Sequence, residues 1–343
     1  AGLSKSDIGN LCNSGYIVRV RHGYYSLADA NDTSEEQLIQ TLLPEAIVCV
    51  ESALFHYGYN DFAFDISKYL TCDGTTENVI SVKVVHQTPS SRWYSGSGIY
   101  RDVELIVTDA VHVSRNGTYV TTPNLATEKD GDVTVKVQTD VQNDSSAQAA
   151  AQIRTTVLDA EGKAVSEAVT TDVTLAANST AEKEQTLKVN KPALWSTENP
   201  NLYYVQTEVL VDGKVKDTYK TTYGFRYINF DVNTGFSLNG KNVKLKGVCM
   251  HHDQGALGAA SERDAVYRQV KKLKEMGCNA IRTSHNTPSS VLLEACNELG
   301  MMVMDETFDG WAFPKNGNSQ DFSTHFNQTI SADNKLLGAT TGD

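Results

Sequence analysis

The segment from residue 278 to 311 limits most strongly what this chain can fold into, because two short apolar runs flank one helical pattern. The runs are 280–282 and 301–304, and neither alternates apolar with polar residues, which is typical of parallel strands covered on both faces. The apolar residues between the runs fall at helical spacing: Val291, Leu292, Ala295 and Leu299. The pattern predicts a strand, a helix and a second strand.

Start and stop signals flank the predicted helix. Thr287 is expected to cap it, Pro288 suits its first position and Gly300 can end it. Polar residues follow each strand, as Thr283-Ser284-His285 and as Asp305-Glu306. In a parallel β/α barrel, residues at the carboxyl ends of the strands form the active face. The sequence therefore predicts a candidate site at these strand ends.

This segment resembles the start of the catalytic barrel of glycoside hydrolase family 2, the family of β-galactosidases and β-glucuronidases. The resemblance rests on the run from Asn279 to His285, on the Leu299-Gly300 turn and on Met304-Asp305-Glu306. The family motif usually has a proline where this chain has Thr287. The resemblance implies a (β/α)8 TIM barrel that hydrolyses O-glycosidic bonds with retention, acting on a β-galactoside or a related carbohydrate. The alternative is an ordinary β/α unit with a hydrogen-bonded histidine at a strand end.

The resemblance also implies which residues bind the sugar. A first barrel strand is expected over 243–250, and it ends in His251-His252-Asp253. His251 and His285 match the family's two sugar-binding histidines, and Arg282 and Asp305 are expected beside them. Trp93 lies in an aromatic loop that resembles the family loop reaching toward the substrate, which implies that Trp93 stacks on the sugar. The alternative is that Trp93 packs in the hydrophobic core.

No catalytic residue is assigned within this chain. A retaining glycosidase needs two carboxyl groups about 5–5.5 Å apart on opposite sides of the scissile bond, and the adjacent Asp305 and Glu306 side chains should diverge. In the family, the two catalytic glutamates come from later strands, and Asn297-Glu298 lies inside the predicted helix instead. We expect the isolated chain to be inactive because the barrel is incomplete.

No cofactor is expected. The family's β-galactosidases bind magnesium through a histidine that the run 307–311 lacks. Adjacent His251 and His252 should point to opposite sides of an extended chain and cannot easily share one metal ion. The six cysteines show no CxxC spacing, and several of them lie within apolar runs. We expect these several to be buried thiols in a cytoplasmic protein, and no disulfide framework.

The charge balance argues against two classes of partner. The chain of 343 residues carries a net charge of −12, which disfavours nucleic acid and anionic membranes. The sequence contains no apolar run of about 18 residues, the length needed to span a bilayer. The first residues lack a hydrophobic leader. A carbohydrate partner remains, and an oligomer is possible.

Four domains are expected along the chain. Residues 1–60 resemble the winged-helix region of abortive-infection-type antitoxin regulators, with a hairpin that turns near Gly23. They carry only three Lys/Arg against seven Asp/Glu, so they lack the basic face that DNA binding requires. Residues 61–107 resemble the end of a sugar-binding jelly roll whose first half is missing, through a gene fusion or an assembly artefact.

The remaining two domains continue the family pattern. Residues 108–227 alternate valines with polar residues and predict an immunoglobulin-like β-sandwich, with turns at 160–163 and 212–213. Residues 228–343 form the N-terminal part of the TIM barrel. Two other functions stay open: a non-catalytic carbohydrate-binding β module, and a DNA-binding regulator acting through residues 1–60.

Overall fold

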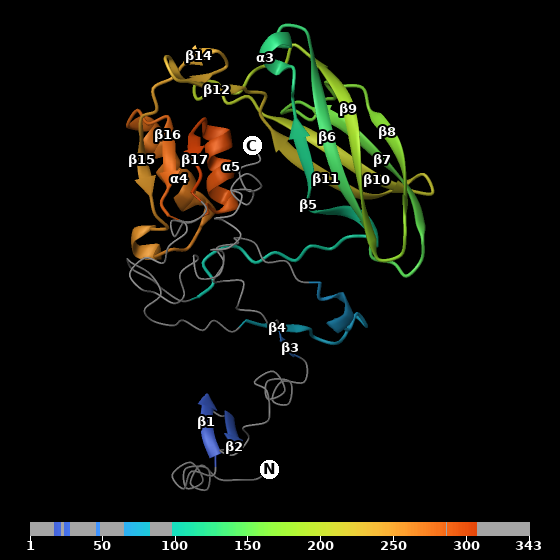
Figure 1. Ribbon diagram of the computed structural model, residues 1–343. Helices are drawn as coiled ribbons and strands as arrows, with labels where there is room; N and C mark the ends of the chain where they lie inside the picture. The colour runs from blue at the N-terminus through green and yellow to red at the C-terminus, as the bar shows by residue number, and fades with distance from the viewer. Residues whose placement is uncertain are drawn as a thin grey trace. The chain divides into compact units, whose positions relative to one another are not determined.

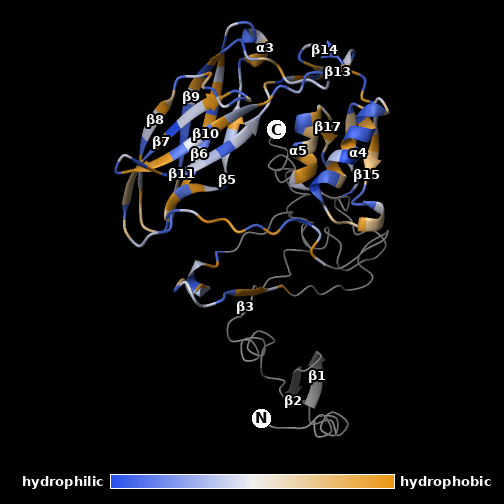
Figure 2. Cartoon of the chain, turned by 180° about the vertical axis from the view of Figure 1, so that it is seen from behind, coloured by the Kyte–Doolittle hydropathy of each residue, from blue (hydrophilic) through white to orange (hydrophobic). Residues whose placement is uncertain are grey.

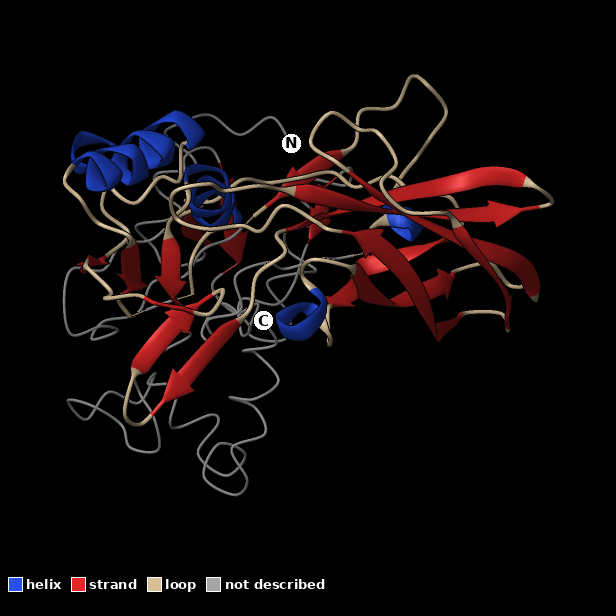
Figure 3. Ribbon diagram, turned by 90° about the horizontal axis from the view of Figure 1, so that it is seen from above, coloured by secondary structure: helices blue, strands red, loops and turns tan. Residues whose placement is uncertain are grey.

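The computed structural model describes the strands 17–21, 24–27 and 46–48 by their backbone, and residues 65–82, 98–285 and 287–306 in full. The chain divides into two compact units. One unit combines residues 1–98 with 308–343, and the other, the main unit, spans residues 99–307. In the described part of the main unit, strands predominate over helices (Figure 3).

Two small pairings are described in the first unit. The strands β1 (Ile17–Arg21) and β2 (Tyr24–Leu27) form the predicted antiparallel hairpin. The strand β3 (Ala46–Val48) pairs in parallel with β4 (Val79–Ser81), and a short 3-10 helix, η2, spans Ser67–Tyr69. The rest of the winged-helix-like segment lies outside the described residues.

Seven strands of the main unit form a β-sandwich (Figure 1). One sheet has the order β11-β10-β7-β8 and the other β5-β6-β9, and every pairing within them is antiparallel. The strands are β5 (Val111–Thr121), β6 (Asp132–Asn143), β7 (Ala149–Leu158), β8 (Val169–Leu175), β9 (Ser179–Asn190), β10 (Tyr203–Val211) and β11 (Lys214–Tyr223). A short helix, α3 (Leu125–Glu128), precedes β6.

The alternation in the sequence explains the sandwich core. Successive side chains of a strand point to opposite faces, so Val133, Val135 and Val137 all point inward and are fully buried. The strands accordingly alternate in hydropathy (Figure 2). The predicted turn at Asp212-Gly213 joins β10 to β11, and both residues have the positive φ, 51° and 72°, that a tight hairpin turn requires.

A polar side chain also crosses the sandwich core. Gln185 of β9 is 2% exposed, and its Nε2 donates to the carbonyl oxygens of Ile153 and Val169 on the opposite sheet, each at 3.0 Å. Its Oε1 accepts from the Thr155 hydroxyl at 2.6 Å. Because a buried amide is costly unless it is hydrogen-bonded, these bonds fix how the two sheets face each other.

A small antiparallel sheet and a parallel sheet follow the sandwich. The antiparallel strands are β12 (Ile228–Asp231), β13 (Gly235–Leu238) and β14 (Lys241–Asn242). The parallel sheet has the order β15-β16-β17, with β15 (Gly247–Met250), β16 (Ala280–Thr283) and β17 (Met302–Met304). The helices are η3 (Gly255–Leu257), α4 (Arg263–Glu275) and α5 (Ser290–Leu299).

The expected strand 243–250 is wrong in its first half. β15 begins only at Gly247, because the backbone N–H of Val243 donates to the carbonyl of Phe236 in the small antiparallel sheet at 3.0 Å. At Gly247 the sheet strands approach so closely that an added Cβ would lie 2.1 Å from the carbonyl oxygen of Ala280. A glycine is therefore required where β15 meets β16.

The helix ends were predicted better than the helix starts. Gly300 closes α5 in the left-handed conformation with φ 74°, as predicted. The cap of α5 is Ser289 rather than Thr287, since the Ser289 side chain accepts from the backbone N–H of Leu292. The helix therefore starts two residues after Pro288.

The sandwich is attached to the amino end of the parallel sheet through Trp195. This side chain is 2% exposed and packs with Ala280 and Met302, which begin β16 and β17. Its Nε1–H donates to the carbonyl of Asn297 near the end of α5 at 2.8 Å. The carboxyl ends of the three strands lie at the opposite end of the sheet from this contact.

Candidate functional site

The parallel register collects polar residues at one edge of the sheet. Cys249 pairs with Arg282, and Arg282 pairs with Met304, so the three strands run in step. The residues that follow the strands therefore meet at the same edge. We call four of them, together with Arg282 near the end of β16, the strand-end cluster: His251, Arg282, His285, Asp305 and Glu306.

The two predicted histidines come together in this cluster. The rings of His251 and His285 lie with their centroids 5.6 Å apart and their planes at 83°. They come from the ends of β15 and β16, which are 30 or more positions apart in the sequence and adjacent in the sheet. Two imidazoles held edge to face can present polar nitrogens to one bound molecule.

Glu306 holds the cationic side of the cluster together. Its carboxylate accepts from Nη2 of Arg282 at 2.8 Å and lies 3.0 Å from Nδ1 of His285. Because a carboxylate is only an acceptor, this contact favours the His285 tautomer that carries its proton on Nδ1. Only 15% of the Glu306 side chain is exposed. Glu306 was not expected to act as a catalytic acid, and this pairing role was not predicted, although an acid placed beside two basic strand ends was a usable signal.

Thr283 connects the last two strands at this edge. Its hydroxyl oxygen accepts from the backbone N–H of Glu306 at 2.9 Å and can donate to Asp305 Oδ1 at 3.4 Å. Surrounding protein raises the pKa of Asp305 by desolvation, although this side chain stays partly exposed to solvent. Asp305 and Glu306 contact different partners, Thr283 for the first and Arg282 and His285 for the second.

A thiol lies at the same edge. The Sγ of Cys249 accepts from Nη1 of Arg282 at 3.6 Å. The neighbouring Ser284 and Arg282 side chains lower the pKa of this thiol below its usual value. The four described cysteines are all free: Cys296 is buried, Cys278 is half-buried, and Cys72 and Cys249 are exposed. Cys249 lies within an apolar run and is therefore more exposed than its sequence context indicates.

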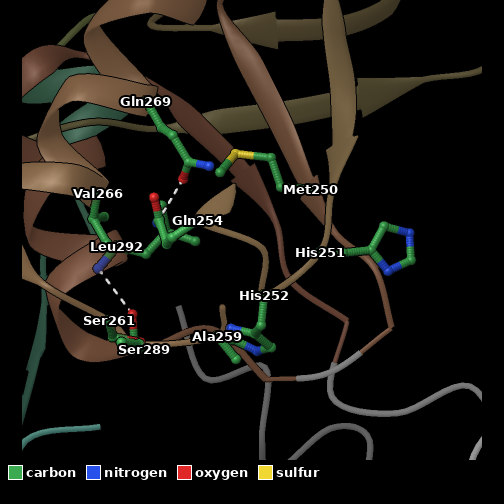
Figure 4. Close-up of a pocket in the computed structure, with 11 residues that line it drawn as sticks. Met250, His251, His252, Gln254, Ala259, Ser261, Val266, Gln269, Ser289 and Leu292 are labelled. Atoms are coloured by element: carbon green, nitrogen blue, oxygen red, sulfur yellow. Dashed lines mark hydrogen bonds between the residues drawn. The ribbon is translucent and has the colours of Figure 1, made fainter. Parts of the chain in front are cut away.

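His252 points away from the cluster. Both His252 and His251 line a small pocket with Gln254, Gln269 and Ser289, and their side chains extend in different directions from the chain (Figure 4). Burial, and next the charge of Arg101, lower the pKa of His252 to about 4. No group of three or more His, Cys, Asp or Glu side chains that could hold a metal ion occurs within the described residues. Trp93 lies outside the part of the chain that the structure describes.

Two regions of the chain match domain models of one protein family. Residues 111–226 match the model of glycosyl hydrolases family 2, and residues 232–340 match that family's TIM barrel domain. Together the two matches cover more than half of the chain. The chain belongs to glycoside hydrolase family 2. The sandwich and the parallel sheet are thus the immunoglobulin-like and TIM-barrel domains of this family.

Individual relatives agree with this assignment. The chain is 40% identical over 273 residues to the β-galactosidase BoGH2A of Bacteroides ovatus. The alignment covers 79% of this chain and 31% of that protein. It is 40% identical over 256 residues to a putative β-glucuronidase of Formosa agariphila, covering 74% of this chain and 23% of that protein. The chain therefore spans less than a third of the length of these curated relatives.

Solved structures show the same fold. A family 2 member from Bacteroides cellulosilyticus superposes with a TM-score of 0.64 at 39% identity, over 70% of this chain and 30% of that chain. A β-glycosidase from Bacteroides vulgatus gives a TM-score of 0.61 at 33% identity, over 74% of this chain and 31% of that chain. No helix within the described ranges combines the length and the apolar character needed to cross a membrane.

Proposed function

We propose that this chain supplies the sugar-binding half of a family 2 active site that hydrolyses β-glycosides with retention. The observation that carries the proposal is the strand-end cluster, in which His251 and His285 meet at 5.6 Å beside the Arg282–Glu306 ion pair. Relatives named β-galactosidase and β-glucuronidase support a β-galactoside or a β-glucuronide as substrate class.

Each member of the cluster receives a role in this proposal. His251 and His285 donate hydrogen bonds to the sugar hydroxyls or accept them. These hydrogen bonds can persist as the sugar ring changes shape toward the transition state. Arg282, which keeps 39% of its side chain exposed, supplies positive charge at the mouth. Asp305 accepts from a sugar hydroxyl, and Trp93 stacks on the apolar face of the ring.

The bond-breaking carboxylates are proposed to lie outside this chain. A retaining mechanism needs an acid that protonates the leaving oxygen and a nucleophile that attacks the anomeric carbon, about 5–5.5 Å apart. Asp305 bonds to Thr283, and Glu306 pairs with Arg282 and contacts Nδ1 of His285.

The proposal includes the finer domain limits. Residues 1–60 form the winged-helix-like segment, 61–107 the partial jelly roll, 108–227 the sandwich and 228–343 the first part of the barrel. The β1–β2 hairpin supports the first of these, and the three parallel strands support the last. In this view the strands β15, β16 and β17 are the first three of eight.

A turnover assay combined with calorimetry tests the proposal. Residues 1–343 are incubated with nitrophenyl β-galactoside and nitrophenyl β-glucuronide, and we expect no release above the blank. In titration calorimetry we expect galactose or glucuronate to bind weakly, and His285→Ala to weaken that binding about tenfold, by the loss of one hydrogen bond to a partly charged group. Robust hydrolysis, or equal binding by the variant, would contradict the proposal.

A further inference from the structure

Arg101 joins the segment before the sandwich to the loop after β16. Its Nη2 donates to the carbonyl oxygen of Thr287 at 2.7 Å, and its Nη1 donates to that of Pro288 at 3.3 Å. The planar guanidinium presents several donors in a fixed fork, which suits two successive carbonyls. These bonds connect positions that are 186 and 187 residues apart in the sequence.

The same arginine contacts the loop after β15. Nη2 lies 3.5 Å from Nε2 of His252, and the lowered pKa of His252 keeps the ring neutral, so Nε2 can accept a hydrogen bond. Next to Arg101, the Tyr100 carbonyl accepts from the N–H of Ser261 at 2.8 Å, and the Tyr100 ring meets His252 edge to face at 5.7 Å. One dipeptide thus binds the loops that follow two adjacent strands.

The contact is more specific than a surface salt bridge. Arg101 donates to neutral carbonyls and is partly buried, and its Nε is buried without a hydrogen-bond partner among the described residues. Burying a guanidinium without a carboxylate is costly, and a generic surface arginine would stay in water. The two directed bonds to the loop are what the side chain gains at this position.

Further hydrogen bonds hold the loop on both sides of His285. The N–H of Ser284 donates to the carbonyl of Met250 at 2.8 Å, and Ser289 caps α5. His285 lies between them, only two residues before Thr287. The carbonyls that Arg101 holds therefore anchor the loop two and three residues after this histidine.

We propose that Arg101 is a positioning residue: by holding the Thr287 and Pro288 carbonyls, it keeps His285 against Glu306 and facing His251. The segment around residue 101 thereby takes part in building the site at the barrel strand ends. The consequence for sugar binding rests on the proposed function, whereas the consequence for the loop does not.

The experiment compares Arg101→Lys, Arg101→Leu and a control, Arg154→Lys. Arg154 pairs with Glu208 on the sandwich at 2.8 Å, so the control makes the same chemical change away from the loop. Hydrogen exchange is followed at the amides of residues 284, 285, 287 and 289, and the imidazole nitrogens of His285 are followed by NMR, all in the full chain without sugar. Lysine keeps the charge and cannot hold two carbonyls with one planar fork.

Both Arg101 variants are expected to exchange at least about tenfold faster at these four amides and to shift the His285 Nδ1 resonance, whereas Arg154→Lys changes neither. Unchanged exchange and an unchanged resonance would overturn the proposal. A uniform rise in exchange across the sandwich as well would also overturn it, because it would indicate a general loss of stability. If the local changes occur and the unmodified chain binds no sugar, Arg101 keeps its positioning role and the proposed function fails.

Discussion

Replacing Glu306 by glutamine tests how the strand-end cluster is held together. The variant keeps the shape of the side chain and removes the charge that faces Arg282 and His285, at 2.8 and 3.0 Å. A hydrogen bond to a charged group contributes about 1.5–3 kcal/mol, and the 39% exposure of the Arg282 side chain places its share at the low end or below. We expect Glu306→Gln to lower the free energy of unfolding by about 2 kcal/mol.

The chain offers a closely matched control for this change. Glu208 accepts from Arg154 at 2.8 Å, with 17% and 38% of the two side chains exposed, against 15% and 39% for Glu306 and Arg282. Glu208→Gln lacks a histidine partner and should cost at most about 1 kcal/mol.

Thermal unfolding and NMR read out the difference. At about 2–4 °C per kcal/mol for a unit of this size, Glu306→Gln should lower the Tm by about 4–8 °C and the control by about 4 °C or less. Only Glu306→Gln should shift the imidazole resonances of His285. Equal Tm shifts together with an unmoved His285 would refute the reasoning that Glu306 binds both partners.

Three further predictions concern single positions. The pKa of His252 is lowered to about 4 in the folded chain, so between about pH 6.5 and pH 4 the unfolded chain binds a proton at this residue that the folded chain does not. As the pH falls through this range, the free energy of unfolding should decrease by up to about 3 kcal/mol. Urea titrations of His252→Gln should show a smaller decrease. Iodoacetamide at pH 8 should label Cys249, whose pKa is lowered, well before Cys296, whose pKa burial raises to about 12; peptide mass spectrometry showing equal labelling would contradict this. Gly247→Ala places a Cβ 2.1 Å from the Ala280 carbonyl and should cost about 3 kcal/mol or more, visible in the denaturant midpoint, and an unchanged midpoint would contradict it.

The elements were predictable where one local pattern decides the structure. The inward valines of β6 and the left-handed Gly300 follow from strand alternation and from the steric freedom of glycine, which act within a few residues. The two strand ends that carry His251 and His285 were also predictable, because parallel strands in register deliver their carboxyl ends to one edge.

The parts that failed depend on contacts between distant residues. Val243 leaves the expected strand because it bonds to Phe236 in another sheet. Thr287 does not cap α5; its carbonyl oxygen is instead bound by Arg101, 186 residues away in the sequence. The role of Glu306 depends on the tertiary contact between three strand ends. The spacing of residues along the chain does not predict such a contact.

The central claim is that His251 and His285 face one sugar. The most direct test is to titrate the full chain with galactose, and separately with glucuronate, while the imidazole nitrogens are followed by NMR. We expect the resonances of His251 and His285 to move together with a single binding curve for one of the two sugars, while those of His112, held by the Asp109 carbonyl in the sandwich, stay in place. If neither strand-end histidine moves with either sugar, or if His112 moves as much as they do, the account is contradicted.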